Sequence, residues 1–200
     1  MGKNRLFPLK IAFGLITIRP ARFSYFFCET CLAYFVPMSP LPVLTGTSNS
    51  VLRSVSLPIK KVDKNIQKLI KTMEVTVKKA KGVGLAAPQI GENIRLILVQ
   101  MNGKQFLPMV NPEISEFSLD NTYDEEGCLS IPGEFGNVWR AKEVMVSFLD
   151  EVGRPKKLRL NDFSARIVQH EIDHLNGILF VDRISEIVSH TEKETNEQYY

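Results

Sequence analysis

The regular part of the chain begins near residue 60, with apolar residues at helical spacing. Between Val62 and Ala80 an apolar residue returns every three or four positions, and lysines occupy the opposite face. The apolar positions are Val62, Ile66, Leu69, Ile70, Met73 and Val77. This spacing is typical of an amphipathic helix that lays one face on a core. We therefore predict a surface helix over residues 62–80.

Two hairpins are predicted farther along the chain. An Asn-Gly dipeptide separates the apolar runs 94–100 and 105–110, which is a strong signal for a β-hairpin. A turn containing Gly153 separates the runs 143–150 and 156–160 in a similar way. Strands joined by such short turns pair in antiparallel fashion. The sequence therefore predicts antiparallel sheet.

A second helix is predicted directly after the second hairpin. Asn161 and Asp162 can each serve as its N-cap residue, and Gly177 is suitable for the position just past its end. The sequence HEIDH, residues 170–174, lies in the middle of this helix.

Length and composition describe an ordinary globular chain. Its 200 residues suffice for one domain, and 44% of them are apolar and 24% charged. A net charge of +3 does not argue for a nucleic-acid partner. Two short basic stretches are interpreted as solvated surface: Lys78, Lys79 and Lys81, and Lys156, Lys157 and Arg159. Three cysteines, an odd number, favour a reducing compartment. The Cys28 and Cys31 pair lacks a second pair at zinc-ribbon spacing and is interpreted as incidental.

Residues 1–40 differ from the rest of the chain. They contain five basic residues and no acidic residue before Glu29, and their apolar stretches are too short to span a membrane. Such a leader resembles an organellar transit peptide. Alternatively, translation begins at Met38, and the upstream residues are not part of the natural protein. We expect a leader over 1–40, a folded domain over 41–190 and a polar tail over 191–200.

The HEIDH sequence predicts a metal site. On a helix, His170 and His174 lie one turn apart on one face and direct ring nitrogens at one point. Glu171 projects beside that point, where it can take a proton from an activated water. Two histidines satisfied by hydrogen bonds in a core are a poorer explanation, because two of only three histidines in the chain fall at ligand spacing. A catalytic site of this kind needs a third protein ligand.

The third ligand has two possible sources. The metzincin pattern would place it at Phe180, which cannot bind a metal. A second peptidase pattern falls on Lys193, and the residues near it that can bind a metal are His190, Glu192 and Glu194. The other source is Cys128 in EEGCLSIPG, because a thiolate suits a borderline metal better than a tail carboxylate does. Considered alone, Cys128 is better explained as an ordinary buried cysteine.

A third stretch, GVGLAAPQIG at residues 82–91, is rich in glycine. Its spacing fits a dinucleotide-binding fingerprint, but the segment follows a helix where that motif must follow a strand. We predict a loop that lies against an extended ligand and ends in the polar side chain of Gln89.

The stretches GVGLAAPQIG, EGCLS and QHEIDHLNG resemble, in order and spacing, the three signature motifs of the peptide deformylases. The resemblance extends over residues 42–185. Together with the predicted elements it implies an α+β fold, in which antiparallel β-sheets pack around a central metal-binding helix and the 62–80 helix lies on the outside. Residues 41–190 are then the catalytic domain.

The resemblance implies hydrolysis of the formyl group from N-formylmethionine at the start of new polypeptides, with release of formate. It implies the metal ligands Cys128, His170 and His174, the general acid/base Glu171, and oxyanion stabilisation by the Gln89 side chain and the Leu129 backbone N–H. Two nitrogens and one sulfur suit Fe²⁺, Zn²⁺, Ni²⁺ or Co²⁺. The resemblance favours Fe²⁺ in the cell.

The substrate it implies is a nascent or released N-formylmethionyl polypeptide. Phe163 and Ile167 precede His170 on the same helix face and can line an apolar pocket for the methionine side chain, and core packing is a compatible explanation. Val83 and Gly84 would pair with the peptide backbone as an added strand. We also expect Glu126 and Arg140 to form an ion pair that braces the Cys128 loop, with an ordinary surface pair as the alternative.

The chain departs from some bacterial deformylases after Leu179, because the basic C-terminal helix used for ribosome contact is missing. Ribosome docking by that route is therefore not expected. We expect a monomer with no direct nucleic-acid or membrane partner. The compartment is the bacterial cytoplasm if Met38 is the start, and an organelle if residues 1–40 are a transit sequence. A binding module without catalysis is the rival outside enzymes, and Glu171 and Gln89 argue against it.

Overall fold

The computed structural model describes residues 39–184, apart from 102 and 104, together with 187–188. All of these belong to one compact unit, residues 37–200. Two α-helices, eight strands and short 3-10 helices make up this described part. None of its helices is both long and apolar enough to cross a membrane.

The first helix, α1 (Lys64–Lys79), confirms the prediction from the apolar spacing. Asp63 caps its N-terminus, and its Oδ1 accepts hydrogen bonds from the backbone N–H groups of Asn65 and Ile66. The inward side of α1 buries Ile70, Met73 and Val77 in one hydrophobic cluster with strands β1 and β2. Its opposite side is exposed.

The larger sheet has five strands, and all its pairings are antiparallel. The strands are β1 (Gly84–Ala86), β2 (Leu96–Met101), β3 (Gln105–Phe117), β6 (Glu143–Leu149) and β7 (Pro155–Asn161), in the spatial order β1-β2-β3-β6-β7. Both predicted hairpins, β2–β3 and β6–β7, are confirmed. Asn102, in the turn of the first, lies outside the described residues. In this described sheet β1 is an edge strand.

The smaller sheet contains β4 (Asn121–Cys128), β5 (Ile131–Ala141) and β8 (Ile187–Val188). The sequence did not predict the β4–β5 hairpin, because NTYDEEGC has no alternation of apolar and polar residues. In the structure only Glu126 of these eight residues is fully buried. The tight turn of this hairpin begins right after Cys128, so the cysteine lies at the tip of a strand.

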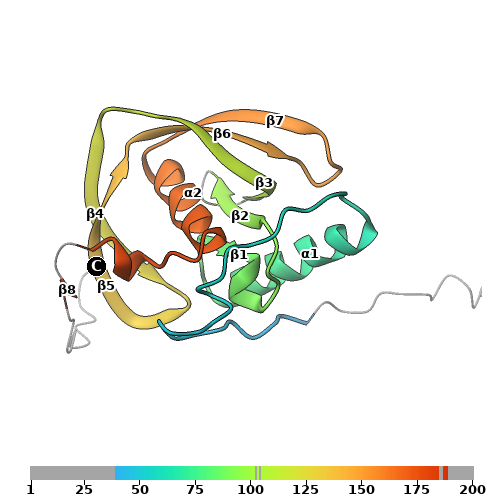
Figure 1. Cartoon of the computed structure of the whole chain (residues 1–200), viewed down its shortest axis with the longest axis horizontal. Helices are drawn as coiled ribbons and strands as arrows, with labels where there is room; N and C mark the ends of the chain where they lie inside the picture. Colours follow the sequence, from blue (N-terminus) through green and yellow to red (C-terminus); the bar gives the residue numbers. More distant parts are fainter. Residues whose placement is uncertain (1–38, 102, 104, 185–186, 189–200) are drawn as a thin grey trace, which may run out of the picture. The chain divides into compact units, whose positions relative to one another are not determined.

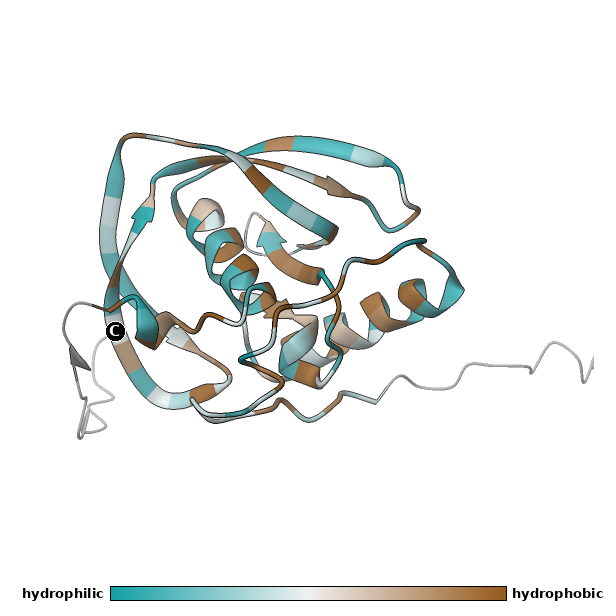
Figure 2. Cartoon of the chain, viewed as in Figure 1, coloured by the Kyte–Doolittle hydropathy of each residue, from teal (hydrophilic) through white to brown (hydrophobic). Residues whose placement is uncertain are grey.

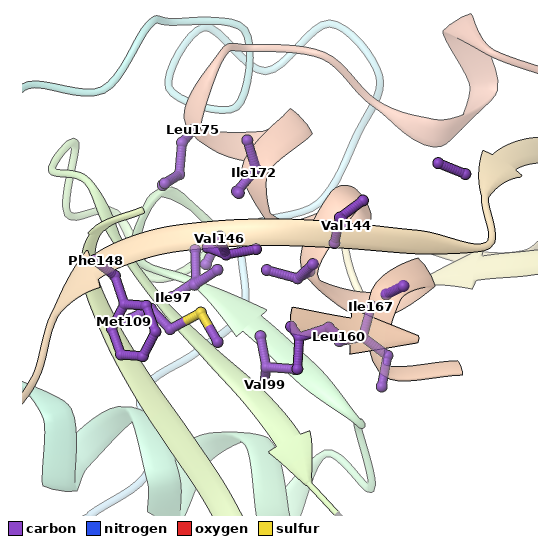
Figure 3. Packing of buried hydrophobic residues seen from close by; sticks show 14 residues of the cluster. Ile97, Val99, Met109, Val144, Val146, Phe148, Leu160, Ile167, Ile172 and Leu175 are labelled. Carbon is purple, nitrogen blue, oxygen red and sulfur yellow. The ribbon is translucent and has the colours of Figure 1, made fainter. Parts of the chain in front are cut away.

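The second helix, α2 (Asp162–Leu175), lies between the two sheets and contacts strands of both (Figure 1). Its apolar side packs on the larger sheet (Figure 3), in a cluster that includes Ile167, Ile172, Leu175, Ile97, Val99, Met109, Val144, Val146, Phe148 and Leu160. Gly177 follows the helix end with φ +72°, and a Cβ there would lie 2.5 Å from the carbonyl oxygen of Arg53. Glycine is therefore required where the chain leaves α2.

The predicted architecture, α+β with antiparallel sheets around a central helix and α1 on the outside, is confirmed. One local prediction is wrong. The segment 82–91 is not a loop throughout, because residues 84–86 form β1 and residues 87–90 form the 3-10 helix η2 (Ala87–Ile90). Three residues are too few for a strand to be detected by periodicity, whereas pairing with β2 creates it in the folded chain.

Several predictions lie outside the described residues. They concern most of the leader, the polar tail 191–200, the incidental pair Cys28 and Cys31, and the alternative ligands His190, Glu192 and Glu194. They stay predictions.

Candidate metal centre and active site

Three side chains that can bind a metal converge between α2 and the tip of β4. Cys128 comes from β4, and His170 and His174 lie one turn apart on α2. Their potential ligand atoms all lie within 4.8 Å of one another, and Cys128 Sγ is 3.2 Å from His174 Nε2. The tail is not needed to complete this group of three.

The two imidazoles differ in their surroundings. His170 Nδ1 lies 2.9 Å from a carboxylate oxygen of Glu126, which leaves Nε2 to face the site. Burial alone would lower the pKa of His170, but hydrogen bonds with Cys128 and Glu126 raise it to about 10. A metal would compete with the proton that gives the His170 ring its charge, because a ligating imidazole is neutral. His174 is only 1% exposed, and burial holds its pKa well below the ordinary value. It is therefore neutral.

Glu126 is the centre of a buried ion network. Burial by itself would raise the pKa of Glu126, but hydrogen bonds from His170 and Arg140 keep it well below its usual range. Arg140 donates from Nε and Nη2 to the two carboxylate oxygens at 2.9 and 3.0 Å. Arg166 donates to Oε1 at 2.7 Å. Because these groups are largely removed from water, they stabilise the charged carboxylate that orients His170.

The ion pair between Glu126 and Arg140 was expected from the sequence, and the structure contains it in a buried position. Arg166, Asp173 and Arg183 extend the network and were not predicted from the sequence. Asp173 accepts from both Arg140 and Arg183. The sequence did contain a signal for these residues. Arg166 and Asp173 are charged residues of α2, and a helix in a central position must bury the sides on which they lie.

Glu171 is positioned as an isolated buried carboxyl. It is 4% exposed, and its Oε2 has no hydrogen-bond partner among the described residues. Burial raises the pKa of Glu171 to about 7, and the charge on His170 opposes this rise. A carboxyl with a pKa near neutrality can both accept and return a proton.

Gln89 and Leu129 bring hydrogen-bond donors to the same place. Gln89, in η2, is 2% exposed, and its side-chain oxygen accepts from the Ala86 backbone N–H at 2.8 Å. This bond sets the amide so that Nε2 points to Ser130 Oγ at 3.1 Å and to Cys128 Sγ at 3.6 Å. Within the described part of the chain, the Leu129 N–H donates no hydrogen bond.

A cavity of about 460 Å³ opens onto these groups. Its lining includes Gln89, Cys128, Leu129, His170 and Glu171, together with Val83, Gly84, Phe163 and Ile167. Ile167 is 4% exposed and Phe163 is 60% exposed, so the first lies at the wall and the second at the rim. Of the predicted ligand, catalytic and substrate-binding residues, the structure thus brings all but the buried His174 to the lining of one cavity.

These residues fit a divalent metal ion. One thiolate and two imidazoles are a suitable donor set for a transition metal. The unpartnered Oε2 of Glu171 and the adjoining cavity leave room for water and substrate beside them.

Comparison with known proteins agrees with this geometry. The family model described as polypeptide deformylase matches residues 41–190. The chain belongs to the polypeptide deformylase family. Enzymes of this family remove the N-formyl group from newly made polypeptides, and this chain is a deformylase.

Similar deformylases are known from several bacteria. A peptide deformylase of Prochlorococcus marinus is 49% identical over 139 residues, covering 68% of this chain and 68% of that protein. The crystal structure of the Thermotoga maritima enzyme is 37% identical, with a TM-score of 0.71 over 74% of this chain and 99% of that one. An Acinetobacter baumannii deformylase bound to Met-Ala-Ser is 40% identical, with a TM-score of 0.69 over 74% of this chain and 99% of that one.

Gly84 determines how closely Glu171 approaches β1 in this deformylase. A Cβ at Gly84 would lie 2.2 Å from Glu171 Oε1. We expect Gly84→Ala to push the carboxyl aside and to lower kcat about 100-fold, since an ångström of misplacement has that effect. The measurement is steady-state deformylation by Gly84→Ala, Glu171→Asp and the double variant. Because aspartate is shorter, the double variant should be no slower than Glu171→Asp alone. Additive losses would contradict this explanation.

Proposed function

We propose that this deformylase binds the formylated N-terminus of a polypeptide in the cavity beside Cys128 and uses Glu171 as its proton carrier. The observation that carries the proposal is the convergence of Cys128, His170 and His174, whose potential ligand atoms lie within 4.8 Å of one another, beside a cavity that Glu171 also lines. The similar Acinetobacter baumannii enzyme was crystallised with Met-Ala-Ser bound, the kind of peptide that remains after deformylation.

The substrate is held by its first side chain and its backbone. The methionine side chain enters the apolar part of the cavity between Phe163 and Ile167. The peptide backbone extends along the unpaired edge of β1, where Gly84 and the backbone N–H of the preceding Val83 form strand-like hydrogen bonds with it; the Val83 carbonyl already accepts from Gln100. The edge position of β1 supports this, because only an edge strand has an unpaired side.

The metal is one divalent ion held by Cys128, His170 and His174, with Fe²⁺ proposed for the cell. When bound, it supplies Lewis acidity, which makes water a stronger acid and polarises a carbonyl oxygen. The direct contact between Glu126 and His170 Nδ1 holds the imidazole for this role.

Glu171 carries the proton through the reaction. Its carboxylate accepts a proton from the attacking water as the oxygen bonds to the formyl carbon. The carbon–nitrogen bond then breaks, and Glu171 returns the proton to the leaving amine. Water and the formamide are thereby converted to formate and a free N-terminus.

Two donors stabilise the charge that grows on the formyl oxygen. They are Gln89 Nε2 and the backbone N–H of Leu129, and such donors act best when they are oriented in advance. Gln89 Nε2 makes two contacts, and the one with Cys128 Sγ is longer and weaker than the one with Ser130 Oγ. The N–H that faces Cys128 is therefore the one available to substrate.

Four further aspects are part of the proposal. We take residues 41–190 as the catalytic domain, the monomer as the working unit, and nascent or released N-formylmethionyl polypeptide as the partner. Because the relatives named above are bacterial, we take the bacterial cytoplasm as the compartment, with an organelle as the alternative.

The test is formate release from formyl-Met-Ala-Ser by protein loaded with Fe²⁺ under anaerobic conditions. Release is expected, and removal of the metal by a chelator should abolish it until Fe²⁺ is restored. An acetylated peptide of the same sequence serves as the control and should not be cleaved. If protein holding one metal per chain released no formate, the proposal would fail and a peptide-binding module would be the better description.

A further inference from the structure

The positive charge of the described chain is concentrated in and around α1. Residues 60–81 contain eight lysines and two acidic residues, although the whole chain has a net charge of only +3. The expectation of no nucleic-acid partner was based on that whole-chain charge. A sum over the chain does not reveal a local concentration of charge, which is what determines binding to a polyanion.

Five of these lysines form one stripe on the exposed side of α1, which we call the lysine stripe. Its members are Lys64, Lys68, Lys71, Lys78 and Lys79, and all five are exposed. At 3.6 residues per turn they fall within a sector of roughly 100° and extend over about 22 Å of helix. Hydrophobic and hydrophilic residues alternate along α1 (Figure 2), and the hydrophobic ones face the core.

The lysine stripe is mostly unneutralised. Of its members only Lys78 forms an ion pair in the described structure, with Glu74 one turn away. The basic cluster on β7 is different, because each of its residues has an acidic neighbour: Asp150 near Lys156, Glu116 near Lys157 and Glu143 near Arg159. Of these two basic clusters, only the one on α1 is thus largely without acidic partners.

The lysine stripe leads to the entrance of the active site. Lys81 follows α1 directly and lines the cavity, together with Gly82 and Val83. A polypeptide with its N-terminus in this cavity would leave close to the C-terminal end of α1. A large assembly that holds the rest of that polypeptide is thus brought near the lysine stripe.

We propose that the lysine stripe of α1 binds the phosphate groups of RNA while the adjacent cavity receives the nascent chain. The choice of RNA over other polyanions rests on the activity on newly made polypeptides, which are attached to an RNA-rich assembly during synthesis. An anionic membrane fits less well, because an interfacial helix inserts its apolar side. The apolar side of α1 is buried, with Met73 and Val77 at 0% exposure.

The experiment compares two triple variants of the metal-loaded full chain that lose the same charge. Lys64→Gln, Lys68→Gln and Lys71→Gln remove three of the five lysines of the stripe, and Lys156→Gln, Lys157→Gln and Arg159→Gln are the control on β7. Binding to a short fluorescein-labelled RNA hairpin is measured by anisotropy over a range of salt concentrations. We expect the α1 triple to bind at least about tenfold more weakly, with a salt slope smaller by about 2 to 3. The β7 triple should bind like wild type.

Three results would overturn the proposal. They are no RNA binding by wild type at about 0.1 M salt, equal weakening by both triples, and binding to phosphatidylglycerol vesicles without binding to RNA. Formate release from formyl-Met-Ala-Ser is measured in parallel and should be unchanged in the α1 triple. RNA binding is read independently of that reaction, so failure of the RNA proposal leaves the deformylase assignment untouched.

Discussion

Replacing Glu171 with glutamine is expected to slow formate release by about 10²–10⁴-fold, the usual contribution of a positioned acid or base. Glutamine has nearly the same shape but cannot accept the proton of the attacking water or return it to the amine. Bound metal should stay at one ion per chain, because Cys128, His170 and His174 are unchanged. Stopped assays of formate and metal analysis of the same samples measure both quantities.

A control substitution shows whether the loss of a different carboxylate on α2 has the same effect. Asp162 lies in the first turn of the same helix and is exposed, and Asp162→Asn should keep full activity. Glu171→Gln should also unfold at nearly the wild-type temperature, since Oε2 of Glu171 makes no hydrogen bond within the described residues. Full activity in Glu171→Gln would show that another group carries the proton.

Replacing Cys128 with alanine is expected to remove both metal and activity. Only two imidazoles would then face the site, and a catalytic centre of this type needs three protein ligands. Changing a residue that merely orients a ligand reduces metal affinity or activity 10–100-fold, so losing a ligand should have a larger effect, at least about 10³-fold. Metal content after gel filtration and formate release under Fe²⁺ measure the two losses.

Two controls make the Cys128 result specific. The other two cysteines, Cys28 and Cys31, can be changed to alanine together, and this variant should keep its metal and activity. A chain ending at Ser189 lacks His190, Glu192 and Glu194 and should also remain active. If truncation removed the metal while Cys128→Ala kept it, the third ligand would lie in the tail and a zinc-peptidase type of site would replace the proposed one.

Local sequence determined the elements whose side chains repeat with a clear period. The spacing from Val62 to Val77 sufficed for α1, and two apolar runs around a turn sufficed for each of the hairpins β2–β3 and β6–β7. The five letters HEIDH sufficed to predict two of the proposed ligands, because a helix turn by itself brings residues four apart to one face. These features depend on contacts between near neighbours in the chain.

Only the tertiary structure brought the third proposed ligand and the proposed oxyanion donors to that pair. Cys128 lies 46 residues from His174, and taken alone it looked like an ordinary buried cysteine. The mostly polar strand β4 has no apolar period, and its position depends on buried ion pairs of Glu126 with Arg140 and Arg166. Such pairs join side chains far apart in sequence and leave no local pattern.

The close approach of Glu171 to Gly84 was likewise decided only by the tertiary structure. A glycine in GVGLAAPQIG predicted closeness to a ligand, whereas the structure places the carboxyl of Glu171, the proposed proton carrier, 2.2 Å from where a Cβ of Gly84 would lie. The lysines of α1 were visible as residues, but the sequence did not show that, among those of the lysine stripe, only Lys78 has an acidic partner in the described structure. Sequence thus determined the elements and the kinds of chemistry, and tertiary packing decided which charges meet, because pairing depends on distances that only the folded chain sets.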